Sequence, residues 1–139
     1  MKVKDVMHPG VTWMTPNTPI SELARKMRDE DIGAIPIGDN DRLVGMVTDR
    51  DITCRALADG LDINRATAGD VMSRGIVYCG ADADIEDAVR IMEKNQVRRL
   101  PVINEKKRMV GMLSLGDISH KVPHMLSGEV VETVSAHHA

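Results

Sequence analysis

The sequence has almost no aromatic residues: among 139 residues it has no Phe, one Trp and one Tyr, against ten Met. A core without aromatic rings must be filled by aliphatic and thioether side chains, and Met adapts well to irregular gaps. This scarcity predicts how the protein packs and assigns no function.

Long hydrophobic runs are also missing. No apolar stretch approaches the roughly 20 residues that cross a bilayer, and the opening MKVKDVMHPGVTWM lacks the apolar core of a secretory signal. We therefore expect a cytoplasmic protein with no membrane partner. The net charge of −3 argues against a nucleic-acid partner, because phosphate-binding surfaces normally carry a basic excess.

The two cysteines, Cys54 and Cys79, are too few for a disulfide framework. A reducing cytoplasm keeps them as thiols, and we expect both to be small buried residues. The five histidines show no closed metal-ligand spacing, so no metal site is predicted; a zinc site at His120 and His124, which are four residues apart, is the less favoured alternative. The sequence has no P-loop, nucleophile elbow or convincing Cys–His pair, and we expect no enzyme.

One pattern is written twice in the chain. DVM at 5–7 returns as DVM at 70–72, an offset of 65 residues. One extra residue in the loop 103–108 makes the offset 66, and LVGMVTDRDI at 43–52 then returns as MVGMLSLGDI at 109–118. Repetition of this extent predicts two copies of one structural unit.

Each copy has the same expected order of elements, β-α-β-β-α. A helix near 19–30 buries a stripe at i, i+3, i+4 and i+7, with Thr18 as its cap before Pro19; the two stripes are Ile20, Leu23, Ala24, Met27 and Ile85, Ala88, Val89, Met92. In the second copy Asp84 supplies an acidic helix start. A further helix is expected to begin near Asp51 and Asp117.

Three strands are expected in each copy. The first lie near 11–14 and 76–79. The second, AIPI and RLPV, contain a proline that indicates an edge or a strand end. The third, LVGMV and MVGML, are apolar throughout and are expected to be buried on both faces. The polar loops between the second and third strands predict hairpins.

These motifs together resemble a pair of CBS domains. The matching residues are both DVM stretches, IGAIPI and VRRLPV at the second strands, and GMVTDRDI and GMLSLGDI at the third. The resemblance is strongest to small stand-alone bacterial CBS-pair proteins. It implies an α/β (α+β) fold in which two β-α-β-β-α repeats pack about a pseudo-twofold axis, with repeats at 4–60 and 69–122 and a C-terminal tail at 123–139.

The repeated hydroxyl and acid, Thr48 with Asp51 and Ser114 with Asp117, have two compatible interpretations. A Ser or Thr followed three residues later by an acid resembles a helix capping box. A carboxylate also accepts hydrogen bonds from ribose hydroxyls in dinucleotide sites. The resemblance implies that the hydroxyl and the acid bind the ribose of an adenine nucleotide in the same way. Gly45 and Gly111 interrupt apolar strands, which indicates that something approaches the backbone closely.

The resemblance implies two clefts, each built from both repeats. The first combines Met46, Thr48 and Asp51 with Val77, Tyr78, Arg98, Arg99 and Pro101. The second combines Met112, Ser114 and Asp117 with Thr12, Trp13, Gly33, Ala34 and Pro36.

The two clefts differ in charge. Arg98 and Arg99 offer guanidinium groups for phosphate, unless they form only a solvated basic face, whereas Gly33 and Ala34 offer none. Trp13 and Tyr78 either stack on a base or, more commonly, pack with a polar tip at the rim. For Arg55 we favour an i, i+4 pair with Asp51 over a phosphate contact.

The sequence therefore predicts a non-catalytic, stand-alone regulatory module that binds AMP, ADP or ATP as a regulatory ligand. We expect a homodimer that acts on a regulated protein the sequence does not identify. Two alternatives stay open: a ligand-free interaction or scaffold dimer with degenerate clefts, and a stress protein that responds through thiols or a metal.

Overall fold

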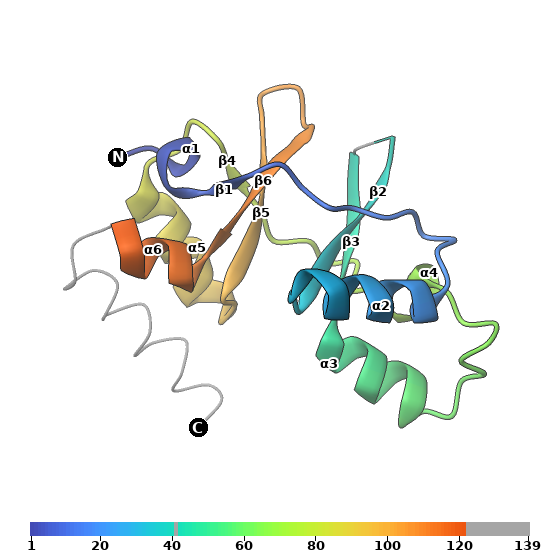
Figure 1. The fold of residues 1–139 in the computed structure, drawn as a ribbon. Helices are drawn as coiled ribbons and strands as arrows, with labels where there is room; N and C mark the ends of the chain where they lie inside the picture. The colour runs from blue at the N-terminus through green and yellow to red at the C-terminus, as the bar shows by residue number, and fades with distance from the viewer. Residues whose placement is uncertain (41, 122–139) are drawn as a thin grey trace. The chain divides into compact units, whose positions relative to one another are not determined.

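The computed structural model describes residues 1–40 and 42–121, and it divides the chain into two compact units (Figure 1). Unit 2 is the continuous stretch Thr12–Ile76. Unit 1 is discontinuous, because it combines Met1–Val11 with the chain from Val77 onward. The predicted tail at 123–139 lies outside the described residues.

Unit 1 contains a four-stranded sheet in the order β1-β6-β5-β4. β5 pairs with β6, and β6 with β1, in antiparallel fashion, while β4 and β5 are parallel. Its elements are α1 (Val3–Val6), β1 (His8–Pro9), β4 (Cys79–Gly80), α5 (Ile85–Asn95), β5 (Arg99–Ile103), β6 (Met109–Ser114) and α6 (Leu115–Lys121).

Unit 2 contains the antiparallel hairpin of β2 and β3. Its elements are α2 (Ile20–Glu30), β2 (Ala34–Asp39), β3 (Arg42–Thr48), α3 (Asp49–Asp51), the π-helical segment η1 (Ile52–Leu57) that continues α3, and α4 (Ala68–Val71). The mixed α/β class and both hairpins are confirmed.

The first predicted strand of each copy is wrong in extent. Residues 11–14 form only a parallel bridge from Met14 to Ile37, and in the second copy the strand is confined to Cys79–Gly80. The two are equivalent, because Cys79 pairs in parallel with Val102, the counterpart of Ile37.

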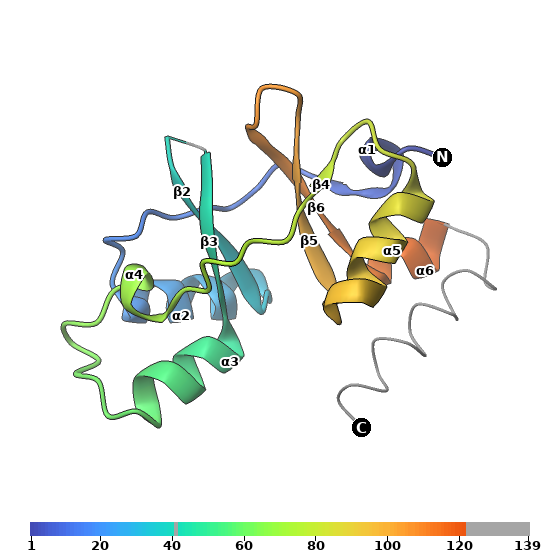
Figure 2. The ribbon, with the colours of Figure 1, turned by 180° about the vertical axis from the view of Figure 1, so that it is seen from behind.

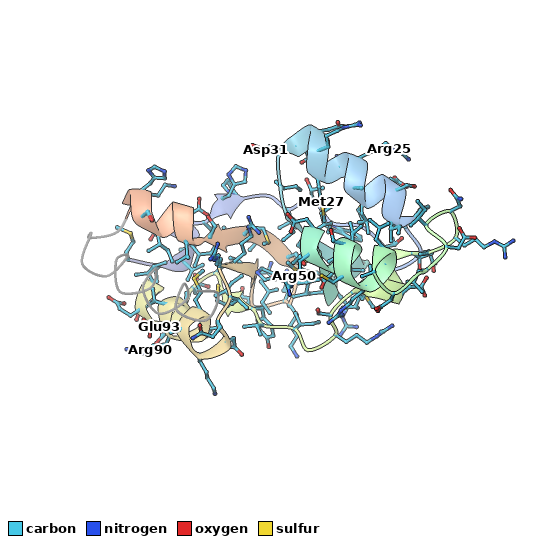
Figure 3. All side chains as sticks on the ribbon, turned by 90° about the horizontal axis from the view of Figure 1, so that it is seen from below. Arg25, Met27, Asp31, Arg50, Arg90 and Glu93 are labelled. Atoms are coloured by element: carbon cyan, nitrogen blue, oxygen red, sulfur yellow. The ribbon has the colours of Figure 1, made fainter. Side chains whose placement is uncertain are left out.

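The amphipathic helices α2 and α5 are confirmed, with two differences. Ala24 is exposed, and Thr18 makes no cap: Pro19 occupies the N-cap position, where no side chain accepts a hydrogen bond. Figure 3 shows Met27 on the side of α2 toward α3, with the exposed Arg25 on the outer side. Asp84 is the N-cap of α5 and forms an ion pair with Lys2 at 3.3 Å.

The short helices α1 and α4 each pack in the unit formed mainly by the other sequence copy (Figures 1 and 2). Val3 and Val6 of α1 are fully buried in the core of unit 1, and the Val3 N–H donates to the Ala83 carbonyl at 2.9 Å. Val71 of α4 is fully buried in unit 2, and the Gly69 N–H donates to the Pro16 carbonyl at 2.8 Å. We call α1 and α4 the exchanged helices.

The prediction that the third strands are buried on both faces is wrong. Both strands instead alternate between buried and half-buried residues. Alternate residues of a strand face opposite sides of its sheet. In both units the buried set meets the amphipathic helix: Ile35, Ile37 and Val47 in unit 2, and Leu100, Val102 and Leu113 in unit 1.

Pro101, the proline of the second strand in the second copy, lies where one edge of β5 is unpaired. β4 pairs with β5 only at Val102 and Ile103, so pairing on that side begins one residue after Pro101. A proline has no N–H to give to such a ladder. The prediction of an edge is therefore right for the N-terminal half of β5, although β5 as a whole lies inside the sheet.

Candidate functional site

The candidate ligand residues that belong to strands lie on the sheet face opposite Ile35, Ile37 and Val47 in unit 2 and Leu100, Val102 and Leu113 in unit 1. Directly opposed residues of an antiparallel pair share one face. In unit 2, Thr48 opposes Ala34 and Met46 opposes Pro36. In unit 1 the equivalent pairs are Ser114 with Arg99 and Met112 with Pro101. The period of two therefore places these candidates on the face opposite Ile35, Ile37 and Val47 or their counterparts. Arg99 is exposed there and the serine, threonine and methionines are half-buried, whereas Ala34, Pro36 and Pro101 are buried.

The Thr48–Asp51 pair forms a complete capping box at the start of α3. The Asp51 N–H donates to Thr48 Oγ1 at 3.1 Å, and the Thr48 N–H donates to Asp51 Oδ2 at 2.8 Å. The capping interpretation is confirmed, with Asp in the place usually held by Glu or Gln. The helix begins at Asp49, two residues before the predicted start.

Ser114 and Asp117 repeat this geometry in unit 1. The Asp117 N–H donates to Ser114 Oγ at 3.1 Å, and the Ser114 N–H donates to Asp117 Oδ2 at 3.0 Å. Here too the helix starts two residues early, at Leu115. In both boxes a half-buried carboxylate is fixed in orientation, and its Oδ1 is not used by the cap.

Gly45 and Gly111 are required by the protein's own packing. A Cβ on Gly45 would lie 2.6 Å from Met72 Sδ, and one on Gly111 would lie 2.6 Å from Met7 Sδ and 2.7 Å from the His8 carbonyl oxygen. The close approach inferred from the sequence is thus made by the DVM methionine that follows each exchanged helix. The recurrence of both DVM and the glycine at matching positions was a signal for this contact.

Arg55 pairs with Asp51, as favoured from the sequence, over a distance of 3.8 Å from Nε to Oδ1. Its Nη1 also donates to the carbonyl oxygens of Val71 and Met72, at 3.3 and 3.4 Å. Sequence reasoning missed this second contact, because it joins segments far apart in the chain.

Arg98 and Arg99 lie beside the Ser114–Asp117 box in unit 1. Arg99 opposes Ser114 across the hairpin, and the Leu115 N–H donates to the Arg98 carbonyl at 3.0 Å. Both arginine side chains are exposed. Gly33 holds the equivalent position in unit 2, where its carbonyl accepts from the Asp49 N–H at 3.0 Å. The charge difference between the copies is therefore built on matching backbone positions.

The remaining candidates precede the amphipathic helices. Thr12 Oγ1 donates to Glu30 Oε1 at 2.9 Å, which ties the start of unit 2 to the end of α2. Glu30 also pairs with Lys26 at 2.6 Å, and these two hydrogen bonds lower its pKa. Trp13 is half-buried and Tyr78 is 49% exposed.

The structure gathers the candidates by unit. Unit 2 holds Thr12, Trp13, Gly33, Ala34, Pro36, Met46, Thr48 and Asp51. Unit 1 holds Val77, Tyr78, Arg98, Arg99, Pro101, Met112, Ser114 and Asp117. Each predicted cleft takes residues from both units, so the meeting of Asp51 with Arg98 and Arg99 stays a prediction.

The cysteines differ from the expectation that both are buried. Cys79 is 2% exposed, as predicted, and burial raises the pKa of its thiol to about 12, so it stays protonated near neutral pH. Cys54 is exposed on η1, and the prediction that it is buried is wrong. A reactive thiol at neutral pH is therefore possible only at Cys54 of the two.

Within residues 1–40 and 42–121, no group of three or more His, Cys, Asp or Glu side chains is arranged to hold a metal ion. His124, His137 and His138 lie outside these ranges. No helix in the same part of the chain is both long and apolar enough to span a bilayer.

The chain belongs to the CBS domain family: the family model matches twice, at residues 3–56 and 68–124. It is 44% identical over 132 residues to hypoxic response protein 1 of Mycobacterium tuberculosis, covering 94% of this chain and 92% of that protein. It is 35% identical to the CBS domain-containing protein YhcV of Bacillus subtilis, covering 96% and 94% of the two chains.

Two solved structures extend the comparison. The crystal structure of hypoxic response protein I with two coordinated zinc ions superposes with a TM-score of 0.82 at 46% identity, covering 88% of this chain and all of that one. The CBS domain pair of MJ0100, in complex with 5-methylthioadenosine and S-adenosyl-L-methionine, gives a TM-score of 0.77 at 28% identity, covering 93% and 98%. The resemblance to stand-alone bacterial CBS pairs is thereby confirmed.

Proposed function

We propose that the protein is a non-catalytic regulatory module of the cytoplasm that binds an adenine nucleotide, AMP, ADP or ATP, between its two repeats. The main support is the hydroxyl–carboxylate pair that occurs at the same position of both copies, on the sheet face away from the core. A CBS domain pair of the same fold binds adenosine-containing ligands. In each box the cap uses Oδ2, so Oδ1 can accept a ribose hydroxyl.

The charge difference between the copies suggests which site takes phosphate. The proposed first site combines the Thr48–Asp51 box with the exposed guanidiniums of Arg98 and Arg99, which suit phosphate oxygens. The second site combines the Ser114–Asp117 box with Gly33 and Ala34, which bring no charge. We therefore expect the first site to prefer phosphorylated adenosine and the second to be weak or to take a less charged ligand.

Ligand binding would act by shifting the relative packing of the two repeats, and a regulated protein would respond to that shift. The size of the response is limited by the difference in ligand affinity between the two packings. We further propose a homodimer. The last residue of η1 and the segment after it carry three exposed apolar side chains, Leu57, Leu61 and Ile63, and such a group is typical of an interaction surface.

A thermal-shift panel with AMP, ADP, ATP, S-adenosylmethionine, zinc and a chelator tests the proposed function. A ligand at 100 times its dissociation constant stabilises the native state by about 2.7 kcal/mol. Stabilisation by the adenine nucleotides supports the proposal. A response to none of the ligands supports a scaffold, and a response to zinc and chelator alone supports a metal-responsive protein; either result overturns nucleotide sensing.

A further inference from the structure

A basic side chain holds each exchanged helix at its C-terminal end. In unit 2, Arg55 Nη1 donates to the carbonyls of Val71, the last residue of α4, and Met72, at 3.3 and 3.4 Å. In unit 1, Lys121 Nζ donates to the carbonyl of Val6, the last residue of α1, at 3.5 Å. The last carbonyls of a helix have no intrahelical partner, so a cation is favourable there.

The two contacts occupy matching positions in the two copies. Arg55 and Lys121 are 66 residues apart, and each follows the capping aspartate of its copy by four residues. Their acceptors, Val71 and Val6, are related by the offset of 65. The same contact is thus made twice with different basic residues, which indicates a shared role in holding the exchanged helix.

In unit 2 this contact is linked to the candidate ligand site. Asp51 Oδ2 is used by the capping box, while Oδ1 lies 3.8 Å from Arg55 Nε. The Asp51 side chain is 15% exposed and that of Arg55 is 50% exposed. One carboxylate therefore serves two elements: it caps α3 through one oxygen, and through Arg55 it reaches α4 with the other.

We propose that Arg55 is a positioning residue that couples the charge on Asp51 to the docking of α4. The carboxylate orients the guanidinium so that Nη1 meets the carbonyls at the end of α4. Engagement of Oδ1 by another group weakens that orientation, and residues 68–73 loosen. The coupling deepens the proposed function and rests on it in one respect, since Asp51 is the acid proposed to bind ribose.

Amide hydrogen exchange of the full-length protein without nucleotide tests the coupling. The informative amides are Met72, which donates to the Ala68 carbonyl, and Ser73, which donates to the Met46 carbonyl, both at 2.8 Å. Ile32, whose N–H donates to Met27 at 3.0 Å, is the reference in the same unit. Local opening without global unfolding accelerates the first two and leaves the reference unchanged.

Arg55→Met keeps the aliphatic stem and removes the charge. We expect Met72 and Ser73 to exchange about two- to fivefold faster, the effect typical of a cation lost from a helix C-terminus. Asp51→Asn keeps a capping oxygen and should accelerate the same amides to a smaller extent. In the double variant the rates should equal those of Arg55→Met alone, because coupled effects do not add.

The matched control is Asp49→Asn, two residues away in α3, whose carboxylate accepts from the Arg50 N–H. We expect this variant to leave the Met72 and Ser73 rates unchanged. The proposal is overturned if Asp51→Asn has no effect on these amides, if the two substitutions act additively, or if Ile32 accelerates in step. Because no nucleotide is present, failure of nucleotide binding in the thermal-shift panel leaves this result standing, and the reverse also holds.

Discussion

At the scale of single residues, the repeated stretch at 43–52 and 109–118 combines glycines required by packing with a carboxylate proposed to bind a ligand. The Gly45 and Gly111 positions are explained by the methionine that follows each exchanged helix, which comes within contact distance of the strand backbone. Thr48 and Asp51 are explained by the capping box, which holds the carboxylate in one orientation. A carboxylate fixed by the backbone needs no further ordering when a ligand arrives, which lowers the entropic cost of binding.

Substitution of the strand glycines should destabilise the protein. Gly111→Ala places a Cβ 2.7 Å from a backbone carbonyl, and Gly45→Ala meets mainly the flexible end of Met72. We expect Gly111→Ala to lower the free energy of unfolding by about 1–3 kcal/mol, the range for overpacking, and Gly45→Ala to cost less. Urea denaturation measures both. Gly75→Ala, with nothing within 4 Å of the new Cβ, is the control, and equal stability of Gly111→Ala and Gly75→Ala would contradict the packing account.

The two thiols should differ in reactivity. At pH 8 a thiol reagent should modify Cys54 rapidly and reach Cys79 only after unfolding, because burial raises the Cys79 pKa to about 12. The Cys79 thiol loses its proton near pH 8.5 when the protein is unfolded but only near pH 12 when it is folded. The free energy of unfolding therefore does not depend on Cys79 below about pH 8.5 and falls as the pH rises from there toward 12. Cys79→Ala should flatten this alkaline loss. Labelling of Cys79 in the native Cys54→Ser variant would contradict its burial.

At the scale of elements, the helix starts at Thr48 and Ser114 are capped, whereas the start of α2 is not. Thr48→Ala and Ser114→Ala should each lower the free energy of unfolding by about 0.5–2 kcal/mol, the usual effect of removing an N-cap hydroxyl. Thr18→Ala is the matched control and should change stability by a few tenths of a kcal/mol. Thermal and urea unfolding measure all three. If Thr18→Ala lowered the free energy of unfolding as much as Thr48→Ala, the N-cap hydrogen bonds would not be what stabilises these helix starts.

The elements also show what the sequence can predict. Periodicity is a local property, and it located α2, α5 and both hairpins within a residue or two. It did not locate the π-helical segment η1, because nothing in ITCRAL separates π from α geometry. The prediction that Cys54 is buried rested on how often free thiols are buried, and it is wrong because Cys54 lies on the exposed side of η1.

At the scale of the whole molecule, the sequence predicts two copies but not which segments pack together. DVM at 5–7 reads as the start of the first copy, yet α1 completes the core of unit 1 with residues from Val77 onward. An offset between copies is the same whether each helix packs with its own copy or with the other. The candidate residues could be chosen from the motif, and their grouping by unit follows the sequence copies, so the placement of the exchanged helices is the part that the repeat does not predict.

The exchange predicts which unit a core substitution affects. Val6→Ala should loosen unit 1 and Val71→Ala unit 2, each by about 2 kcal/mol for the buried surface lost. Amide exchange at Val97 reports on unit 1 and at Ile32 on unit 2, since both donate to a carbonyl of their own unit. If Val6→Ala accelerated only Ile32, the helices would pack by sequence copy.

Calorimetric titration of ADP into the wild type, Asp51→Ala and Arg98→Ala/Arg99→Ala tests the central proposal most directly, with Asp49→Ala as the control. The account predicts saturable binding to the wild type and to the control. It predicts affinity about tenfold weaker or worse in the other two variants, because each loses hydrogen bonds to or from a charged group. Equal affinity in all four proteins, or no binding to the wild type, would contradict it.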